Sequence, residues 1–226
     1  MQGIGEINPG EVLADVIAGV AGSWLRSGDV VVVTQKVVSK SEGRLAPIDP
    51  HDPMGHKPLV EAEAVRVLRR RGDLVMTETR HGFVCANSGV DVSNVARGWA
   101  ALLPVDPDRS ARRIRDGLRA RLDLQVAVLV SDTFGRPWRR GATDVAIGIA
   151  GLAGVADLRG TTDSFCRELQ VTEVCIADEV AAAAELVMGK ARSVPVAVVR
   201  GLDAGLLREG SVRDEVVRPH GEDLFR

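Results

Sequence analysis

Two polar segments of the sequence each place an acidic residue where it could bind a divalent metal ion. In a polar loop, Asp91 and Asn94 stand three residues apart. Mg²⁺ and Mn²⁺ prefer such hard oxygen ligands and complete their shell with phosphate oxygens and waters. Asp132 and Thr133 follow the apolar run 126–130 after a single serine, so a buried strand would fix this carboxylate beside a crevice. The alternatives are an Asx turn at the first acid and an ordinary strand-end turn at the second.

Basic residues that could bind an anionic substrate follow the second acid and an earlier apolar run. Arg136, Arg139 and Arg140 follow the second acid, and arginine makes bidentate contacts with phosphate or carboxylate groups. Lys36 and Lys40 are two of only four lysines and lie just beyond an apolar run, from which a lysine can reach a phosphate. The alternative for all five is a solvated surface position. The four histidines show no partner pattern, so histidine catalysis is not expected.

The elements that must position these residues are short helices and strands in mixed order. Buried apolar runs predict strands at 30–33, 74–79, 83–86, 126–130, 145–149 and 194–199. Apolar stripes and stop signals predict helices at 10–24, 58–71, 106–122 and 178–190. The third helix has a strong start, because Asp106 is an N-cap acid and Pro107 follows it. Polar and Gly-rich stretches predict loops at 48–58, 87–94 and 132–144, and a flexible tail with a frayed helix after 201.

The order of these elements predicts an α+β fold, because helices and strands do not alternate as in βαβ units. Neither a GxxxxGK[ST] phosphate loop nor a complete dinucleotide fingerprint is present. The chain has 226 residues, 45% of them apolar and 27% charged, which is typical of a globular protein. A net charge of −2 argues against nucleic acid as the main partner.

The cysteines and the chain start bear on the compartment. Cys85, Cys166 and Cys175 are odd in number and show no CxxC spacing, so we expect buried free thiols in a reducing compartment. The N-terminus lacks a signal-like apolar region, and no stretch approaches the ~20 apolar residues of a membrane span. A cytoplasmic protein is therefore expected.

Taken in order, these segments resemble the coenzyme F420-0:L-glutamate ligase family. Each segment alone is a weak match, but the ordered set is specific and spans nearly the whole chain. The matching stretches, which include Ser131-Asp132-Thr133-Phe134-Gly135-Arg136, are 28–33 with 38–44, 87–95, 102–108, 131–136, 168–172, 177–179 and 198–201.

The resemblance implies a metal site beside a nucleotide site. The implied metal ligands are Asp91, Asp132, Thr133 and Glu215. The implied nucleotide contacts are the N-terminal residues Ile4, Gly5, Glu6 and Ile7, then Gln35, Lys36, Lys40 and Asn94. Within this set, the resemblance assigns catalytic roles to Lys40 and Asp132.

The resemblance also implies a reaction. GTP phosphorylates a carboxylate of the F420-0 precursor, and the amine of L-glutamate attacks the resulting acyl phosphate, with further γ-glutamyl additions. Two divalent ions, Mg²⁺ or Mn²⁺, assist, and K⁺ is a further candidate. The resemblance further implies a two-lobed α+β subunit that pairs as a homodimer. We therefore expect one ligase domain of two intertwined lobes over 1–226.

The chain departs from the family pattern at its start, where Ile4-Gly5 stands in place of Leu-Pro. In actinobacterial relatives a flavin-reductase-like domain often follows, so the chain is expected to be a stand-alone ligase or an N-terminal half. Two other functions stay open from the residues alone: a non-catalytic GTP- and metal-binding module, and a metal-dependent phosphohydrolase.

Overall fold

A four-stranded sheet forms the centre of the computed structural model, which describes residues 1–223 and 225. Its strand order is β11 (Val196–Val199), β1 (Val30–Thr34), β7 (Ala127–Arg136) and β8 (Arg139–Ala150). Strand β1 runs parallel to β7 and antiparallel to β11, whereas β7 and β8 form a long antiparallel hairpin. The valines of β1 are fully buried, which explains why the strand is an uninterrupted β-branched run.

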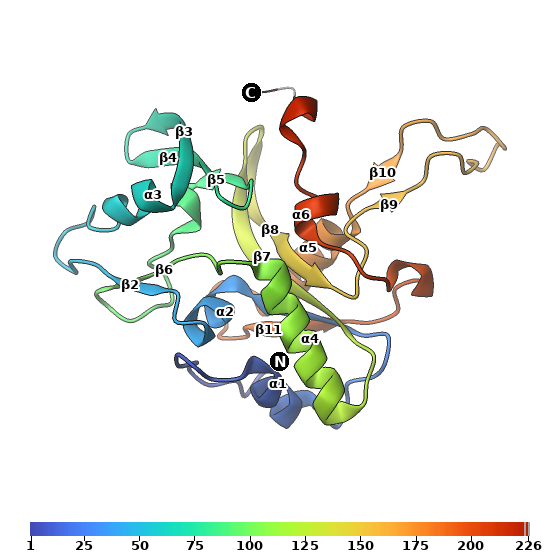
Figure 1. Ribbon diagram of the computed structural model, residues 1–226, viewed down its shortest axis with the longest axis horizontal. Helices are drawn as coiled ribbons and strands as arrows, with labels where there is room; N and C mark the ends of the chain where they lie inside the picture. The colour runs from blue at the N-terminus through green and yellow to red at the C-terminus, as the bar shows by residue number, and fades with distance from the viewer. Residues whose placement is uncertain (224, 226) are drawn as a thin grey trace.

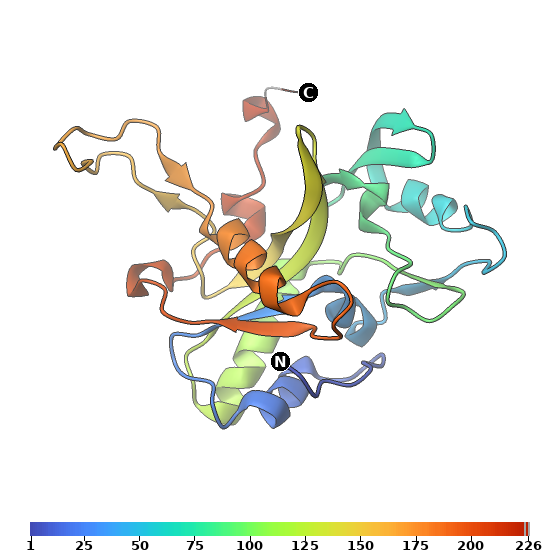
Figure 2. The same cartoon turned by 180° about the vertical axis from the view of Figure 1, so that it is seen from behind.

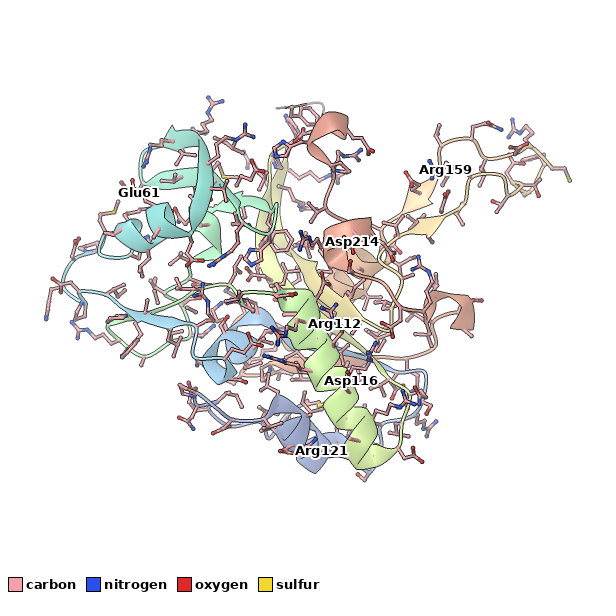
Figure 3. All side chains as sticks on the ribbon, in the orientation of Figure 1. Glu61, Arg112, Asp116, Arg121, Arg159 and Asp214 are labelled. Carbon is pink, nitrogen blue, oxygen red and sulfur yellow. The ribbon has the colours of Figure 1, made fainter. Side chains whose placement is uncertain are left out.

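Helices cover both faces of this sheet. Helix α4 (Pro107–Leu122) lies in front of it with α1 (Leu13–Ala21) in Figure 1, and α5 (Ile176–Met188) lies over the opposite face in Figure 2. Beyond its first turn, the buried side of α4 is apolar, with Ala111, Ile114 and Leu118, whereas Arg112, Asp116 and Arg121 lie along the rest of its surface (Figure 3). This amphipathic pattern fixes α4 on the sheet through hydrophobic burial.

A smaller lobe, residues 45–102, packs beside the sheet. It contains β2 (Leu45–Pro47) paired with β6 (Trp99–Ala101), helix α3 (Lys57–Glu63), and a second sheet. That sheet has the order β3 (Ala64–Arg71), β4 (Leu74–Thr79) and β5 (Val84–Ala86), and the 3₁₀ helix η1 (Asn87–Gly89) follows it. The lobe has its own small core, formed by Val60, Val75, Val90, Ala100 and Leu102.

The remaining short elements lie after β8. Strands β9 (Ala156–Asp157) and β10 (Glu173–Val174) begin an arm that projects from the body in Figures 1 and 2. The C-terminal part contains η2 (Ala204–Leu206), α6 (Val212–Glu215) and η3 (His220–Glu222). In the described part of the chain, no helix has the length and apolar character needed to cross a bilayer.

The α+β class predicted from the sequence is confirmed, as are most of its elements. The N-cap is confirmed in atomic detail, because Asp106 Oδ1 accepts a hydrogen bond of 2.8 Å from the Arg109 amide. Helix α2 (Gln35–Ser41) follows β1 directly, so Val37 and Val38 are helical and do not extend the strand.

Two predicted elements are wrong. The helix expected at 58–71 ends at Glu63, and 64–71 forms the edge strand β3, because pairing with β4 outweighs the helical apolar stripe. The loop expected at 132–144 is instead the outer half of the β7–β8 hairpin. Its polar sequence reflects solvent exposure of a paired ladder, not an absence of structure.

The tail predicted to be flexible is docked on the body. Val212 of α6 is fully buried. The buried carboxylate of Asp108, in the first turn of α4, accepts hydrogen bonds from the Val212 and Ile149 amides at 2.9 and 2.8 Å. A carboxylate that satisfies otherwise orphaned backbone donors holds such a short helix in place.

Candidate metal and phosphate site

Asp91 and Lys36 meet between the two lobes. Lys36 is the second residue of α2, and its Nζ lies 2.6 Å from Asp91 Oδ2. The Ser93 amide donates to Asp91 Oδ1 at 2.7 Å, so the Asx turn considered from the sequence is present as well. Burial opposes ionisation of Asp91, but the bond to Lys36 and its charge hold the pKa of this carboxyl below its ordinary value.

Asp132 lies on β7 near this ion pair. Strand β1 ends opposite Ser131, and beyond that point the described pairing of β7 is with β8 alone. The pKa of Asp132 is raised to about 7, mainly by burial. The charges of Asp91 and Asp144 also raise this pKa, whereas the hydrogen bond from the Thr133 amide and the charge of Lys36 lower it. Carboxylates this close repel one another, and a divalent cation removes that repulsion.

Asp144 belongs to the same acidic cluster and was missed from the sequence. It faces Thr133 across the β7–β8 ladder, and its side chain is almost fully buried. Ser131 Oγ and Thr133 Oγ1 donate to its two oxygens at 2.8 and 2.7 Å. Only a prediction of the β7–β8 hairpin register, which pairs Asp144 with Thr133, could have found this residue. The sequence analysis predicted a loop for this segment and therefore missed it.

The N-terminal segment reaches the site through an ion pair. Lys40, one helical turn after Lys36, is buried and pairs with Glu6. The structure therefore brings the predicted nucleotide loop, 4–7, against α2. Gln35 lies deeper: its Nε2 donates to Ser39 Oγ at 2.6 Å, and its Oε1 is buried without a hydrogen-bond partner. That position suits an internal support better than a direct ligand contact.

Lys190, after α5, is a second residue that the sequence analysis did not select. Its Nζ lies 3.7 Å from Asp91 Oδ2, and its carbonyl accepts a hydrogen bond of 3.3 Å from Asn94 Nδ2. Asn94 has φ of 54°, a left-handed conformation that asparagine tolerates. Three of the four lysines in the chain therefore lie on the elements that surround Asp91.

Other predicted residues make their contacts elsewhere. Glu215 Oε2 accepts from the Gly154 amide at 2.9 Å, and Glu215 also pairs with Arg208 at 2.8 Å. Arg136 donates to the carbonyl of Arg140 at 3.2 Å near the exposed end of the hairpin. Among the residues that the structure describes, no group of three or more His, Cys, Asp or Glu side chains is arranged to hold a metal.

The donor set nevertheless fits a magnesium-type ion. Such ions use one or two protein carboxylates and take their other ligands from water and substrate phosphates. Asp91 and Asp132 supply two carboxylates from different lobes, and Thr133 supplies a hydroxyl. The side chain of Asp91 already lies beside the positive charges of Lys36 and Lys190.

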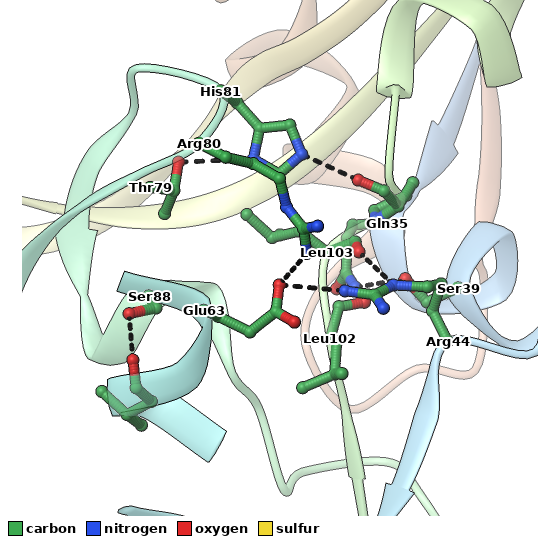
Figure 4. Close-up of polar contacts among 12 residues, drawn as sticks. Gln35, Ser39, Arg44, Glu63, Thr79, Arg80, His81, Ser88, Leu102 and Leu103 are labelled. Carbon is green, nitrogen blue, oxygen red and sulfur yellow. Dashed lines mark hydrogen bonds and ion pairs between the residues drawn. The ribbon is translucent and has the colours of Figure 1, made fainter. Parts of the chain in front are cut away.

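A polar network around Glu63 joins the small lobe to Arg44 and to the segment that follows β6 (Figure 4). Glu63 accepts a hydrogen bond of 2.9 Å from Arg44 and also binds Arg80. Arg44 Nε donates to the Leu103 carbonyl, and His81 Nε2 donates to that of Pro104, both at 2.9 Å. These carbonyls lie two and three residues after Ala101, whose backbone pairs with that of Asp91, so the network helps to position Asp91.

Comparisons with known proteins identify the family of the chain. The sequence model of the F420-0:gamma-glutamyl ligase family matches residues 3–201. The chain is 40% identical over 244 aligned residues to the coenzyme F420:L-glutamate ligase of Methanothermobacter thermautotrophicus, covering 100% of this chain and 97% of that relative. It is 41% identical over 238 residues to the protein of the same name from Methanopyrus kandleri, covering 98% and 94%.

These matches define the class of the protein as a ligase. More specifically, the chain belongs to the F420-0:gamma-glutamyl ligase family.

Proposed function

We propose that this protein uses GTP to join L-glutamate to the deazaflavin precursor F420-0 in coenzyme F420 biosynthesis, and that it adds further γ-glutamyl units. The relatives named above are coenzyme F420:L-glutamate ligases. The observation that carries the proposal is that the carboxylates of Asp91 and Asp132, which come from different lobes, lie near one another. Lysines on the adjoining elements contact Asp91. This arrangement suits a metal-bound nucleotide triphosphate.

The reaction requires activation of a carboxylate, because a bare carboxylate has too poor a leaving group for amide formation. In the proposed sequence, the precursor's carboxylate oxygen attacks the γ-phosphorus of GTP, and GDP leaves. The glutamate nitrogen then attacks the acyl carbon, the C–O bond to phosphate breaks, and the amine loses a proton. The net products are the amide, GDP and inorganic phosphate.

Each residue of the site has a role in this proposal. Divalent ions, Mg²⁺ or Mn²⁺, supply charge neutralisation of the triphosphate, and Asp91, Asp132 and Thr133 would hold them. Lys36 and Lys190 would exchange their contacts with Asp91 for phosphate oxygens, and Lys40 would add positive charge from α2.

The remaining roles rest on resemblance or on charge. Asn94 and the segment 4–7 would contact the nucleotide, and K⁺ is a further candidate ion. The predicted metal role of Glu215 would require a rearrangement of its contacts with Arg208 and the Gly154 amide. The arginines of the hairpin end would bind the substrate's phosphodiester. A homodimer, and a flavin-reductase-like domain in longer forms, are further parts of the proposal.

Mass spectrometry of the precursor after incubation with the protein, GTP, Mn²⁺ and L-glutamate tests the function. We expect a gain of one or more glutamyl units that requires GTP. Asp132→Asn should abolish the product without loss of fold, because the amide keeps the side-chain shape and removes repulsion from nearby carboxylates. Asp116→Ala, on the exposed side of α4, is the matched control and should keep activity.

The outcomes separate the possible functions. GTP hydrolysis without precursor or glutamate would indicate a phosphohydrolase. GTP binding without turnover of any substrate would indicate a non-catalytic module. Near-normal ligation by Asp132→Asn would contradict the metal site proposed here.

A further inference from the structure

The hydroxyl group of Thr133 has only one hydrogen, and the fold already uses it. Thr133 Oγ1 donates to Asp144 Oδ1 at 2.7 Å, and the two residues face each other across the β7–β8 ladder. The second oxygen of the same carboxylate accepts from Ser131 Oγ at 2.8 Å. Asp144 is 3% exposed, so these strands hold its carboxylate away from solvent.

This arrangement determines what Thr133 can bind. A hydroxyl offers one donor hydrogen and two acceptor lone pairs. With the hydrogen directed to Asp144, Thr133 presents only lone pairs, which suit a cation and cannot donate to a phosphate oxygen. The backbone amide of Thr133 is likewise committed, because it donates to Asp132 Oδ1 at 2.9 Å.

We propose that Asp144 is a positioning residue of the metal site, which it serves by orienting the hydroxyl of Thr133 toward the ion. Both oxygens of Asp144 accept hydrogen bonds from Ser131 and Thr133, so in this proposal Asp144 acts through Thr133 and is not itself a metal ligand. Partners of this kind fix the orientation and basicity of a metal ligand, and their loss typically costs about 10- to 100-fold in metal affinity. This inference rests on the metal site in the proposed function.

A purely structural role for Asp144 predicts different behaviour. Two hydrogen bonds across a hairpin stabilise the hairpin whether or not a metal binds. Substitution would then lower stability, and any effect on metal affinity would not depend on the hydroxyl of Thr133. The two roles therefore differ in the coupling between Asp144 and Thr133, which a double-mutant cycle measures.

Mn²⁺ binding to the 226-residue chain, followed by the electron paramagnetic resonance signal of the free ion, is the test. It requires neither GTP nor turnover. The variants are Asp144→Val, Thr133→Val, the double variant and Ser131→Ala. The last is the matched control, because it removes the other hydrogen bond to the same carboxylate.

We expect Asp144→Val and Thr133→Val each to weaken Mn²⁺ binding by about 10- to 100-fold. The double variant should be no weaker than Thr133→Val, and Ser131→Ala should bind nearly as wild type does. Wild-type affinity in Asp144→Val, or losses that multiply in the double variant, would overturn the inference.

Asp144→Asn keeps the test informative if the valine variant does not fold. Its amide oxygen can still accept from Thr133, so its loss of affinity should be smaller than that of Thr133→Val and should vanish in the Thr133→Val background. A loss that persists in that background contradicts the positioning role.

Failure of the proposed metal site has a distinct signature. If the wild-type protein and Asp132→Asn bind Mn²⁺ equally weakly, the metal site and this inference are both wrong. If Asp132→Asn loses binding but Thr133→Val and Asp144→Val do not, only the inference is wrong.

Discussion

The ion pairs of Glu63 with Arg44 and Arg80, here called the Glu63 network, offer a quantitative test of how the two lobes are joined. Glu63→Gln keeps the size of the side chain but removes the charge shared by Arg44 and Arg80. Glu63 is only 15% exposed and Arg44 21%, so solvent screens this pair weakly. A hydrogen bond to a charged group contributes about 1.5–3 kcal/mol, and breaking a fully buried pair costs about 3–5 kcal/mol. For this partly buried site we expect a loss of about 2 kcal/mol.

Urea denaturation followed by circular dichroism measures the loss. At an m-value of about 2 kcal/mol/M, the midpoint should fall by about 1 M. The control is Glu61→Gln on the same helix. Glu61 pairs with Arg70 at 2.9 Å, but both side chains are more than half exposed, so the cost should stay below about 1 kcal/mol. Equal midpoint shifts for the two variants would refute the assigned role of the Glu63 network.

Three further predictions follow from burial and close packing. Burial holds the pKa of His81 below its ordinary 6.5, so the unfolded state binds the proton more readily than the folded state does. The contribution of His81 to the free energy of unfolding should therefore be complete above about pH 6.5 and fall as the pH is lowered. His81→Gln should remove this pH dependence in urea titrations. Burial raises the pKa of Cys85 to about 12, so this thiol is not ionised at pH 8 and should react slowly. A thiol reagent at pH 8 should therefore label the exposed Cys166 and spare the buried Cys85 until urea unfolds the chain. A Cβ at Gly148 would lie 2.3 Å from backbone atoms at the start of α4, so Gly148→Ala should lower the free energy of unfolding by about 3 kcal/mol. Gly135 has open space around it, so Gly135→Ala should change that free energy little in the same urea assay.

The sequence alone determined the elements whose signals are local. The buried valines predicted β1, and the Asp106–Pro107 pair predicted the start of α4. Both signals act within a few residues, through burial on both faces of a strand and through an N-cap. The ordered motifs also identified the family, although each motif alone was weak evidence.

Only the tertiary structure decided which residues come together. Asp91 and Asp132 are brought near one another by packing between lobes, and Lys190 reaches the same carboxylate from beyond α5. Asp144 became visible only through the register of the hairpin. Segment 64–71 changed from a predicted helix to a strand because its partner, β4, supplies hydrogen bonds that no local pattern reveals. Local signals specify elements, but long-range pairing sets the register and the neighbours on which the site depends.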